Sequence, residues 1–441
     1  MNGEIKNQKK IVNAWCMYDW ANSVYSLVIT SAIFPVYFQS VTTLKNDAGI
    51  VLNDKVSFLG FVLTNSVLYS YALSFSFLLI ALISPVLSSM ADYSGKKKSF
   101  MRFFCYLGSA ACLMLFFFTN DTITFGIFMF ILASIGYSGS IVFYNAFLPE
   151  IATEDRFDRI SAKGFSLGYS GSILLLIVSL AMILYPGTFG ISSTGLATRI
   201  SFLLVGLWWF GFSQYTFHYL PGNVYKKDPK GSLLLNGFNE LKKILVDLKK
   251  QDLLRKFLLS FFFYNMGVQT VLYLATIFGE KELNLSSELL IATILVLQLV
   301  AIAGSFLFSF ISGKTGNIYA LMISVFIWII VSVLAYFITT STQFILLAGL
   351  VGIVMGGIQS LSRSTYAKLI PDDTTDHASY FSFFDVTEKI SIVLGTFVYG
   401  LINQLTGSMR MSSLALAVFF IIGLIFLSRI PSEKVYRIKV N

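Results

Sequence analysis

The chain has 441 residues, of which 56% are hydrophobic and only 12% are charged, whereas an ordinary soluble domain carries about 25% charged residues. This composition, with 43 Phe, excludes a soluble globular protein and predicts a polytopic membrane protein. The net charge of +9 does not indicate a nucleic-acid partner, because the basic residues follow the pattern expected at membrane surfaces. The three cysteines stand at no metal-ligand spacing, so we expect no metal and no cofactor.

The first apolar run, 14–38, is long enough to cross a bilayer core of about 30 Å, which takes about 20 helical residues. It is too long for the core of a cleavable signal peptide, and none is expected. The run contains an acid, Asp19, which in hydrocarbon needs water or a polar partner. Polar residues follow Asp19 at spacings of +3, +4, +7 and +11, namely Asn22, Ser23, Ser26 and Thr30. Two interpretations are open, a buried polar network between helices or a helix lining a solute path, and the second fits the rest of the chain better.

Hydropathy predicts twelve membrane spans and hence an all-α membrane protein. The spans are 14–38, 67–90, 100–119, 122–147, 165–186, 199–219, 256–279, 288–311, 318–339, 343–369, 379–404 and 412–430. A cytoplasmic N-terminus places 25 Lys and Arg inside and only five outside. The five outside are Lys45, Lys55, Arg199, Lys281 and Arg410. We therefore expect both termini in the cytoplasm and the protein in the plasma (inner) membrane.

The hydrophilic stretch 221–255 divides the chain into a six-span half, 1–220, and a second six-span half, 256–441. Apolar residues recur in this linker at helical spacing: Leu234, Phe238, Leu241, Leu245 and Leu248. The pattern predicts an amphipathic helix suited to the cytoplasmic headgroup layer, where it would meet lipid. Of the two roles this allows, a plain tether between the halves is favoured over one in binding the membrane surface. The two halves echo each other weakly, which is typical of transporters built from two repeats.

After the second span the sequence reads SSMADYSGKKK, and it resembles the loop 2–3 signature of the major facilitator superfamily (Gly-x-x-x-Asp-Arg-x-Gly-Arg-Lys). A tight turn at Gly95 would place Asp92 where it can accept hydrogen bonds from the N-terminus of a neighbouring helix. In that superfamily such contacts hold the cytoplasmic side closed. Asp92, Gly95 and Lys96 are therefore predicted to act in gating.

Four further stretches resemble the vacuole-effluxer-like (autophagy-related permease) branch of that superfamily. They are YDWANS at 18–23, NAFLPE at 145–150, YNMGVQT at 264–270 and GIQSLSRS at 357–364. The resemblance implies two six-helix bundles and a cavity lined by spans 1, 4, 7 and 10. One departure is Met266, which stands where members of that branch often have an acid.

Charged residues also occur within the later spans. Gln359 and Arg363 lie one turn apart in the tenth span, and Arg363 has no acid one turn away on its own helix. Arg363 is therefore predicted to bind ligand, with snorkelling to the cytoplasmic surface as the alternative. In the eleventh span Asp385 and Lys389 are also one turn apart, with Glu388 adjacent. We expect Asp385 and Lys389 to form a structural or gate pair rather than a binding site, and we group Glu388 with them.

An enzyme is not expected. Two Gly-x-Ser-Gly stretches, at 136–139 and 168–171, resemble the serine motif of intramembrane proteases, but His218 and His377 are both predicted outside the membrane core. No Gly-x-x-x-x-Gly-Lys-[Ser/Thr] loop for nucleotide phosphates is present. The glycines at 164, 168 and 171 fall on one helix face and suit close helix packing.

The sequence thus predicts a secondary transporter that works by alternating access, acts as a monomer and couples transport to a proton or a sodium ion. Its candidate ligand residues are Asp19, Asn22, Tyr25, Tyr144, Asn145, Asn265, Gln269, Gln359 and Arg363. An acid and an arginine with amides and rings between them suit a small zwitterion. The resemblance favours neutral amino acids, because eukaryotic relatives are associated with their export from the vacuole. The alternatives are a sugar transporter, or a lipid-moving or sensor protein on the same scaffold.

Overall fold

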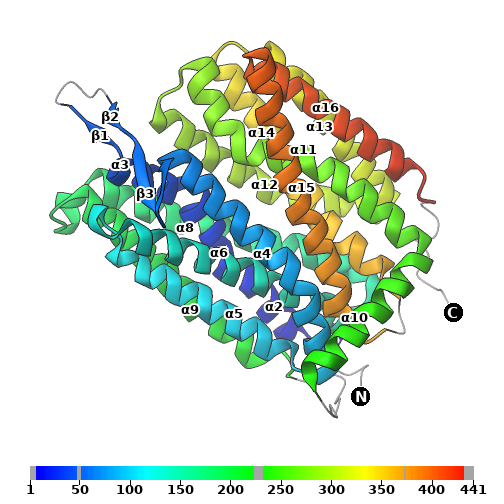
Figure 1. The fold of residues 1–441 in the computed structure, drawn as a ribbon. Coiled ribbons are helices and arrows are strands. Elements are labelled where there is room, and N and C mark those ends of the chain that lie inside the picture. Colours follow the sequence, from blue (N-terminus) through cyan, green and yellow to red (C-terminus); the bar gives the residue numbers. More distant parts are fainter. Residues whose placement is uncertain (1–5, 47–50, 223–231, 372–373, 432–441) are drawn as a thin grey trace.

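The computed structural model describes residues 6–46, 51–222, 232–371 and 374–431. Almost all of them lie in long helices that form two bundles side by side (Figure 1). Eleven helices of the described chain are long and apolar enough to cross a membrane. A twelfth long helix, α15 (His377–Thr406), packs among them, but it carries Asp385, Glu388 and Lys389 and is more polar. The prediction of an all-α polytopic membrane protein is confirmed.

The first bundle, called here the N bundle, contains the first six spans. Its elements are α2 (Lys9–Val24), η1 (Tyr25–Ile33), α3 (Phe34–Thr42), α4 (Asn65–Ser94), α5 (Lys97–Met114), η2 (Leu115–Phe117), η3 (Asn120–Thr122), α6 (Ile123–Ala146), α7 (Leu148–Ile151), η4 (Glu154–Arg156), α8 (Phe157–Leu184), η5 (Pro186–Phe189) and α9 (Thr194–Tyr219). The start of α2 lies at the same end of the molecule as α10 (Leu233–Lys250), and we call this the α10 end (Figure 1).

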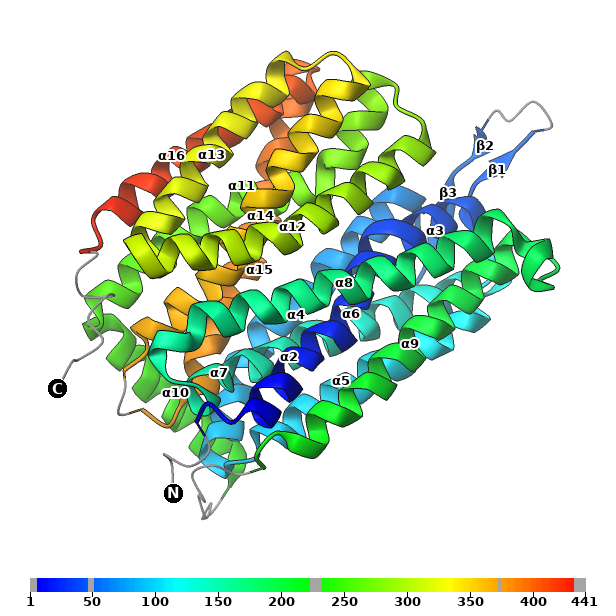
Figure 2. The same cartoon turned by 180° about the vertical axis from the view of Figure 1, so that it is seen from behind.

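The second bundle, the C bundle, contains the last six spans. Its helices are α11 (Asp252–Leu283), α12 (Ser287–Thr315), α13 (Asn317–Phe337), α14 (Ser341–Leu369), α15 and α16 (Met409–Ser428). Figure 2 shows α8 of the N bundle beside α12 and α14 of the C bundle, and these helices are in contact. The bundle interface therefore runs along α8, and α4 meets α15 on its other side.

The first span is not a uniform helix. Its middle, η1, is a π-helix that ends just before Pro35, and α3 continues from there. Proline has no N–H to donate and crowds the preceding turn, and a π segment changes the helical register around it. Short π segments occur frequently at functional sites. The polar stripe that begins at Asp19 on α2 therefore changes its helical register where η1 begins, at Tyr25.

Two short hairpins join the first and second spans, and the sequence did not lead us to expect them. The first pairs β1 (Leu44–Lys45) with β2 (Val51–Asn53), and the second pairs β3 (Lys55–Phe58) with β4 (Phe61–Thr64). The second turns at Leu59 and Gly60, both with positive φ, which suits a tight two-residue hairpin loop. The hairpins stand at the end of the molecule opposite α10 (Figure 1).

Helix α10 forms where the linker pattern predicted a helix, and residues outside the predicted apolar stripe pack against the N bundle. Ile244 is buried, and Gly237 lies so close to Met90 of α4 that a side chain there would overlap it. Phe238 and Leu245, which belong to the apolar stripe predicted for the headgroup layer, are exposed. The helix therefore packs on the end of α4 through one stripe and presents a second apolar stripe outward.

Small residues bring α8 against α2. A Cβ at Gly164 would overlap the carboxylate of Asp19, and one at Gly168 would meet Ser23 Oγ at 2.5 Å. At Gly171 an added Cβ would lie 2.8 Å from the carbonyl oxygen of Trp20. The glycines at 164, 168 and 171 therefore allow the close approach that the sequence indicated, and they place α8 directly over the acid of α2.

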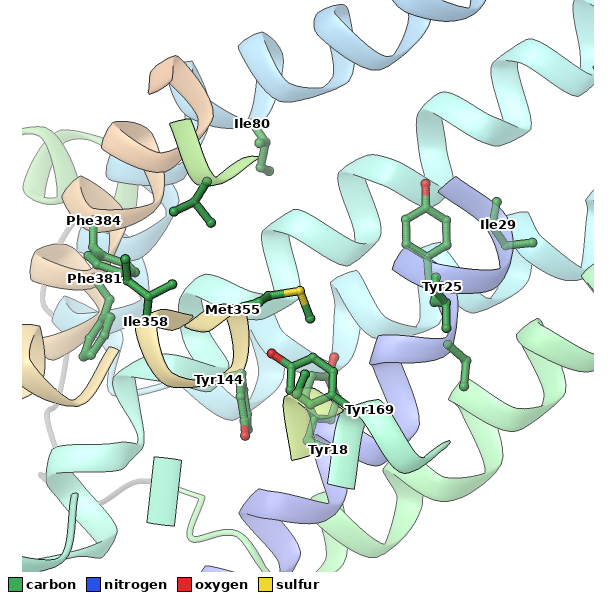
Figure 3. Close-up of a cluster of buried hydrophobic side chains, with 14 of the residues drawn as sticks. Tyr18, Tyr25, Ile29, Ile80, Tyr144, Tyr169, Met355, Ile358, Phe381 and Phe384 are labelled. Atoms are coloured by element: carbon green, nitrogen blue, oxygen red, sulfur yellow. The ribbon is translucent and has the colours of Figure 1, made fainter. Parts of the chain in front are cut away.

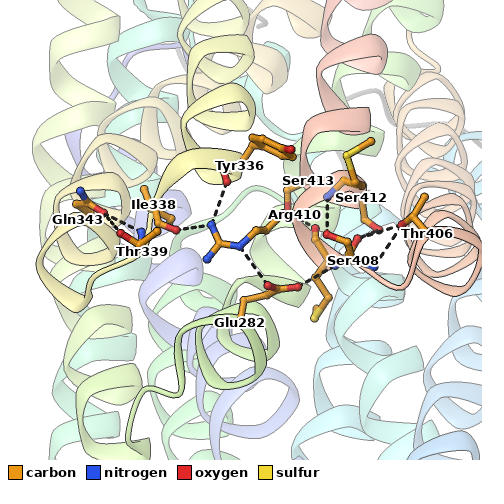
Figure 4. Close-up of polar contacts among 12 residues, drawn as sticks. Glu282, Tyr336, Ile338, Thr339, Gln343, Thr406, Ser408, Arg410, Ser412 and Ser413 are labelled. Atoms are coloured by element: carbon orange, nitrogen blue, oxygen red, sulfur yellow. Dashed lines mark hydrogen bonds and ion pairs between the residues drawn. The ribbon is translucent and has the colours of Figure 1, made fainter.

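At the end opposite α10, one arginine ties together three helices of the C bundle (Figure 4). Arg410 at the start of α16 donates to Glu282 Oε2 of α11 at 3.2 Å. It also donates to the carbonyl oxygens of Tyr336, in the last turn of α13, and Ile338, directly after α13, at 3.0 and 2.5 Å. Glu282 also accepts the backbone N–H of Met409 at 2.9 Å. These contacts lie within the C bundle and fix its helix ends without involving the N bundle.

Candidate functional site

The candidate site is built around an ion pair between the two bundles. Arg363 Nη1 of α14 lies 3.1 Å from Asp19 Oδ2 of α2, and both side chains are nearly inaccessible, at 4% and 6% exposure. Tyr144 of α6 donates its hydroxyl to the same carboxylate oxygen at 2.7 Å. Asp19 is thus satisfied by one residue from each bundle, and Arg363 takes as its counter-ion an acid 344 residues away.

The guanidinium of Arg363 makes further contacts, and they too are with the N bundle. Its Nε donates to Ser161 Oγ and its Nη2 to the Ser161 carbonyl oxygen, each at 2.9 Å. It also lies over the rings of Phe165 and Trp15, at 4.2 and 4.7 Å from their centroids. Rings stabilise a desolvated cation through their electron-rich faces. A residue of the C bundle is therefore held in a cage of N-bundle groups.

The rings of this cage are themselves fixed. Trp15 stacks on Tyr144 with centroids 4.5 Å apart and donates its indole N–H to the Tyr144 carbonyl oxygen at 2.8 Å. Figure 3 shows Tyr144 and Tyr169 of the N bundle in one buried cluster with Met355 and Ile358 of α14. The cage is therefore preorganised by apolar packing across the interface.

The pair lies in the half of the molecule nearest to α10. Asp19 is ten residues from the start of α2, and Arg363 is six residues from the end of α14. At 1.5 Å per residue these intervals correspond to about 15 and 9 Å along the helices. Every hydrogen bond between the bundles in the described residues likewise comes from the half of its helix nearest α10.

Asp92 lies at the α10 end of this interface. It caps the N-terminus of α15 by accepting the backbone N–H groups of Ala378 and Ser379, at 3.3 and 2.7 Å, and the Ser379 hydroxyl at 2.8 Å. Gly95 ends α4 with φ of 67°, the left-handed conformation that favours glycine. A carboxylate at a helix N-terminus meets free N–H groups and the positive end of the helix dipole. The turn thus directs an N-bundle acid onto a C-bundle helix.

Lysine 97, rather than Lys96, contacts this acid. Lys96 is exposed, whereas Lys97 is buried, lies 3.5 Å from Asp92 Oδ1 and forms an ion pair with Glu150 of α7. The sequence motif alone could not distinguish the neighbouring lysines, because the turn at Gly95 decides which one points inward. Glu150 was visible as an acid at the end of a predicted span but was not singled out.

A second polar contact at this end, centred on Asp158 of α8, was not foreseen. Its carboxylate pairs with Lys368 of α14 at 2.8 Å and accepts hydrogen bonds from Ser312 of α12 at 2.9 Å and from Asn317 of α13 at 2.7 Å. One N-bundle acid thereby joins three C-bundle helices. The available signal was an acid in the loop before one predicted span and a lysine at the end of another.

The three charged residues of α15 lie together. Lys389 Nζ is 3.3 Å from Asp385 Oδ1 and 3.5 Å from Glu388 Oε2, and it lies 5.3 Å from the ring centroid of Phe77 on α4. Gln269 of α11 reaches Glu388 Oε1 at 3.5 Å. The cluster belongs to the C bundle but touches the N bundle through Phe77.

The other candidate residues are divided between separate places. Asn265 donates to Ser391 at 2.6 Å inside the C bundle, and Tyr25 shares a 2.6 Å hydrogen bond with Ser134 inside the N bundle. Gln359 accepts from Tyr169 across the interface at 2.6 Å. Within the described residues, Asn22 Nδ2 and Asn145 Oδ1 are buried and have no hydrogen-bond partner. The structure therefore brings Asp19, Tyr144 and Arg363 into one group and leaves Tyr25 and Asn265 outside it.

Residues 7–438 match the sequence profile of a family described as "Vacuole effluxer Atg22 like". The chain belongs to this family. It is 33% identical over 432 residues to a Bacillus subtilis (strain 168) protein named "Uncharacterized MFS-type transporter YxiO", with 97% of this chain and 96% of that protein covered. It is 24% identical over 477 residues to Autophagy-related protein 22-1 of Aspergillus terreus, with 86% of this chain and 77% of that protein covered.

Solved structures agree with this assignment at the level of the fold. The human organic anion transporter MFSD10 (TETRAN) superposes with a TM-score of 0.71 at 12% identity, covering 95% of this chain and 99% of that one. The Escherichia coli fucose:proton symporter FucP gives 0.67 at 14%, covering 96% and 98%. The predicted major facilitator fold with its two helical bundles is confirmed. This member of the Atg22-like family is a multi-pass membrane transporter of that superfamily, and family and fold indicate a transporter rather than an enzyme.

The two adjacent lysines provide a matched test of the contact at Asp92. Lys97→Gln leaves Asp92 and Glu150 without their buried cation, and removing one partner of a buried pair costs roughly 3 kcal/mol or more. We expect a clear fall in the Tm of the purified protein and greater labelling of a cysteine introduced at Ser379. Lys96→Gln, which changes an exposed side chain, is expected to leave both unchanged. Equal effects of the two substitutions would contradict this assignment.

Proposed function

We propose that this protein is a secondary active transporter that moves a small zwitterionic solute, foremost neutral amino acids, by alternating access. The observation that carries the proposal is the buried Asp19–Arg363 pair, whose two members belong to different bundles. The contacts between bundles at the α10 end support an assignment of this conformation as closed on that side.

Opening the α10 end has to separate Asp19 from Arg363. Each charge is buried, and leaving either one unpaired costs about 3–5 kcal/mol. A zwitterion carries an ammonium group that can replace Arg363 beside Asp19 and a carboxylate that can replace Asp19 beside Arg363. The solute would then offset the cost of separation, and a ligand shifts a conformational equilibrium only through such differential binding.

Two amides provide further polar contacts for such a solute. Asn22 lies one turn beyond Asp19, and Asn145 follows Tyr144 directly. Their unpartnered atoms, Nδ2 of Asn22 and Oδ1 of Asn145, are buried among the described residues and can donate to a carboxylate and accept from an ammonium group. Buried polar atoms are normally paired, so a bound solute accounts for both. A hexose could use these amides but would leave both charges of a separated ion pair unmatched.

Gating and coupling are assigned to the remaining charged groups. Asp92 and the turn at Gly95 hold α15 against α4 in the closed state, while Lys96 lies outside this contact. The second gate element consists of Asp385, Glu388 and Lys389. These residues lie on α15, so they must move whenever its N-terminus separates from Asp92. A coupling proton or sodium ion would be bound by Asp19 or by the α15 acids, since Met266 supplies no ionisable group.

The solute class can be tested by thermal stabilisation with leucine, tyrosine, a short peptide and glucose. We expect the zwitterions to raise Tm and glucose to have no effect. The double variant Asp19→Asn with Arg363→Gln removes both charges together and leaves neither buried alone. It is expected to remain folded and to lose at least tenfold in leucine affinity. Stabilisation by glucose alone, undiminished in the double variant, would overturn the proposal in favour of a sugar.

The role of Asp19 in coupling can be tested in proteoliposomes. Asp19→Asn removes the only carboxylate of the central group, so concentrative uptake should be lost, while exchange of solute across the membrane can persist. Asp121→Asn on exposed η3 is the matched control and should transport like the wild type. If Asp19→Asn accumulates solute against a gradient as well as the control does, Asp19 has a structural role only.

Orientation in the membrane follows from the basic residues, and we propose that α10 and both termini are cytoplasmic. The three native cysteines are buried, so single cysteines can be introduced and labelled from one side. Lys45→Cys and Lys281→Cys should react with an impermeant reagent added outside, whereas Lys243→Cys and Lys314→Cys should react only after permeabilisation. Labelling of positions 45 and 243 from the same side would exclude this topology.

A further inference from the structure

A groove of about 490 Å³ opens on the C bundle between α11, α15 and α16, and it is separate from the proposed solute site. Its walls are apolar, and they include Leu259 and Ile390, which are 42% and 43% exposed. Exposed apolar side chains on membrane-spanning helices face lipid. The groove is therefore open to the hydrocarbon of the membrane.

Positive charges gather at one end of this groove. Arg255 and Lys256 come from the start of α11, and Arg429 comes from the end of α16. Lys256 is paired with the only acid of the lining, Asp252, at 2.6 Å. Arg255 donates to the carbonyl oxygen of Lys249 at 3.0 Å. In the described part of the chain neither arginine has a carboxylate within ion-pair distance, so the rim has two uncompensated guanidinium groups.

The charged groups of the groove lie at its rim, and its apolar side chains lie further along the helices. Leu259 lies four residues beyond Arg255 on α11, and Phe262 lies seven beyond it, which corresponds to about 6 and 10 Å along the helix. Directly after α16, the guanidinium of Arg429 lies 5.7 Å from the ring centroid of Phe426 on that helix, which also lines the groove. The cations thus stand at the level of lipid headgroups, and the rings stand at the level of acyl chains.

We propose that this groove binds an anionic glycerophospholipid. Arg255 and Arg429 hold the phosphodiester, because guanidinium groups match its oxygens with two N–H donors each. One acyl chain lies along Leu259, Phe262 and Ile390. Basic pockets between membrane helices are suited to anionic headgroups, and the apolar walls select a lipid over free phosphate. Because the lipid bridges α11, α15 and α16, its binding stabilises the C bundle.

The test uses the full-length protein in detergent with added phosphatidylglycerol, phosphatidylcholine or inorganic phosphate. We expect phosphatidylglycerol to raise Tm and to remain bound in native mass spectrometry, and the other two to do neither. The double variant Arg255→Gln with Arg429→Gln should lose at least tenfold in affinity for phosphatidylglycerol. The matched control is Arg102→Gln with Lys242→Gln, since Arg102 is also an exposed arginine over a phenylalanine ring, 5.3 Å from that of Phe217. The control should bind like the wild type.

Three results would overturn the proposal: equal stabilisation by phosphatidylcholine, stabilisation by phosphate alone, or wild-type affinity in the double variant. A measurement on the unmodified chain covers the case in which the double variant does not fold. Photoactivatable phosphatidylglycerol should crosslink to peptides of α11, α15 or α16, and crosslinks confined to the N bundle would equally contradict the site.

Discussion

Two opposite charges that cannot stay buried alone constrain the whole interface between the bundles. Arg363 belongs to the C bundle, yet its carboxylate, its serine and its aromatic rings all come from the N bundle. A buried pair adds little net stability against a well-packed apolar alternative, but breaking it is costly. The pair therefore acts mainly on which arrangement of the bundles is allowed. Gly164 is part of the same constraint, because any side chain there would overlap Asp19.

The other contacts across the interface repeat this arrangement nearer to the α10 end. Asp92 and Asp158 are both N-bundle acids, and each is satisfied by C-bundle groups, the first by the N-terminus of α15 and the second by Lys368 and its neighbours. Three acids of one bundle thus depend on donors of the other. The proposed alternating access has to exchange all three sets of contacts, so each set would shift the balance between the two proposed states by its own differential free energy.

The sequence predicted what depends on local spacing. Span positions, the turn at Gly95 and the glycine face of α8 all follow from residues close together in the chain. It could not predict that Arg363 would meet Asp19, because 344 residues separate them. From the sequence alone, the two side chains could equally well bind opposite ends of a solute or pair with each other. The side chains of the adjacent helices decide which of Lys96 and Lys97 points inward. They also decide which of the two apolar stripes of α10 packs against protein. Met90 of α4 selects the stripe at Gly237, and no periodicity in the linker encodes that neighbour.

Helix α15 carries three charged side chains in its middle, and its position explains why. Its N-terminus is capped by Asp92, Lys389 in its middle reaches Phe77 of the N bundle, and Ile390, the next residue, lines the groove on the outer side. One helix therefore contacts the opposite bundle on one side and membrane lipid on the other. A helix that served only as a membrane anchor would gain nothing from burying Asp385 and Lys389 in place of apolar side chains. These charges are tolerated because each has a partner within the described structure, and in the proposed mechanism they connect the movement of α15 to the gate.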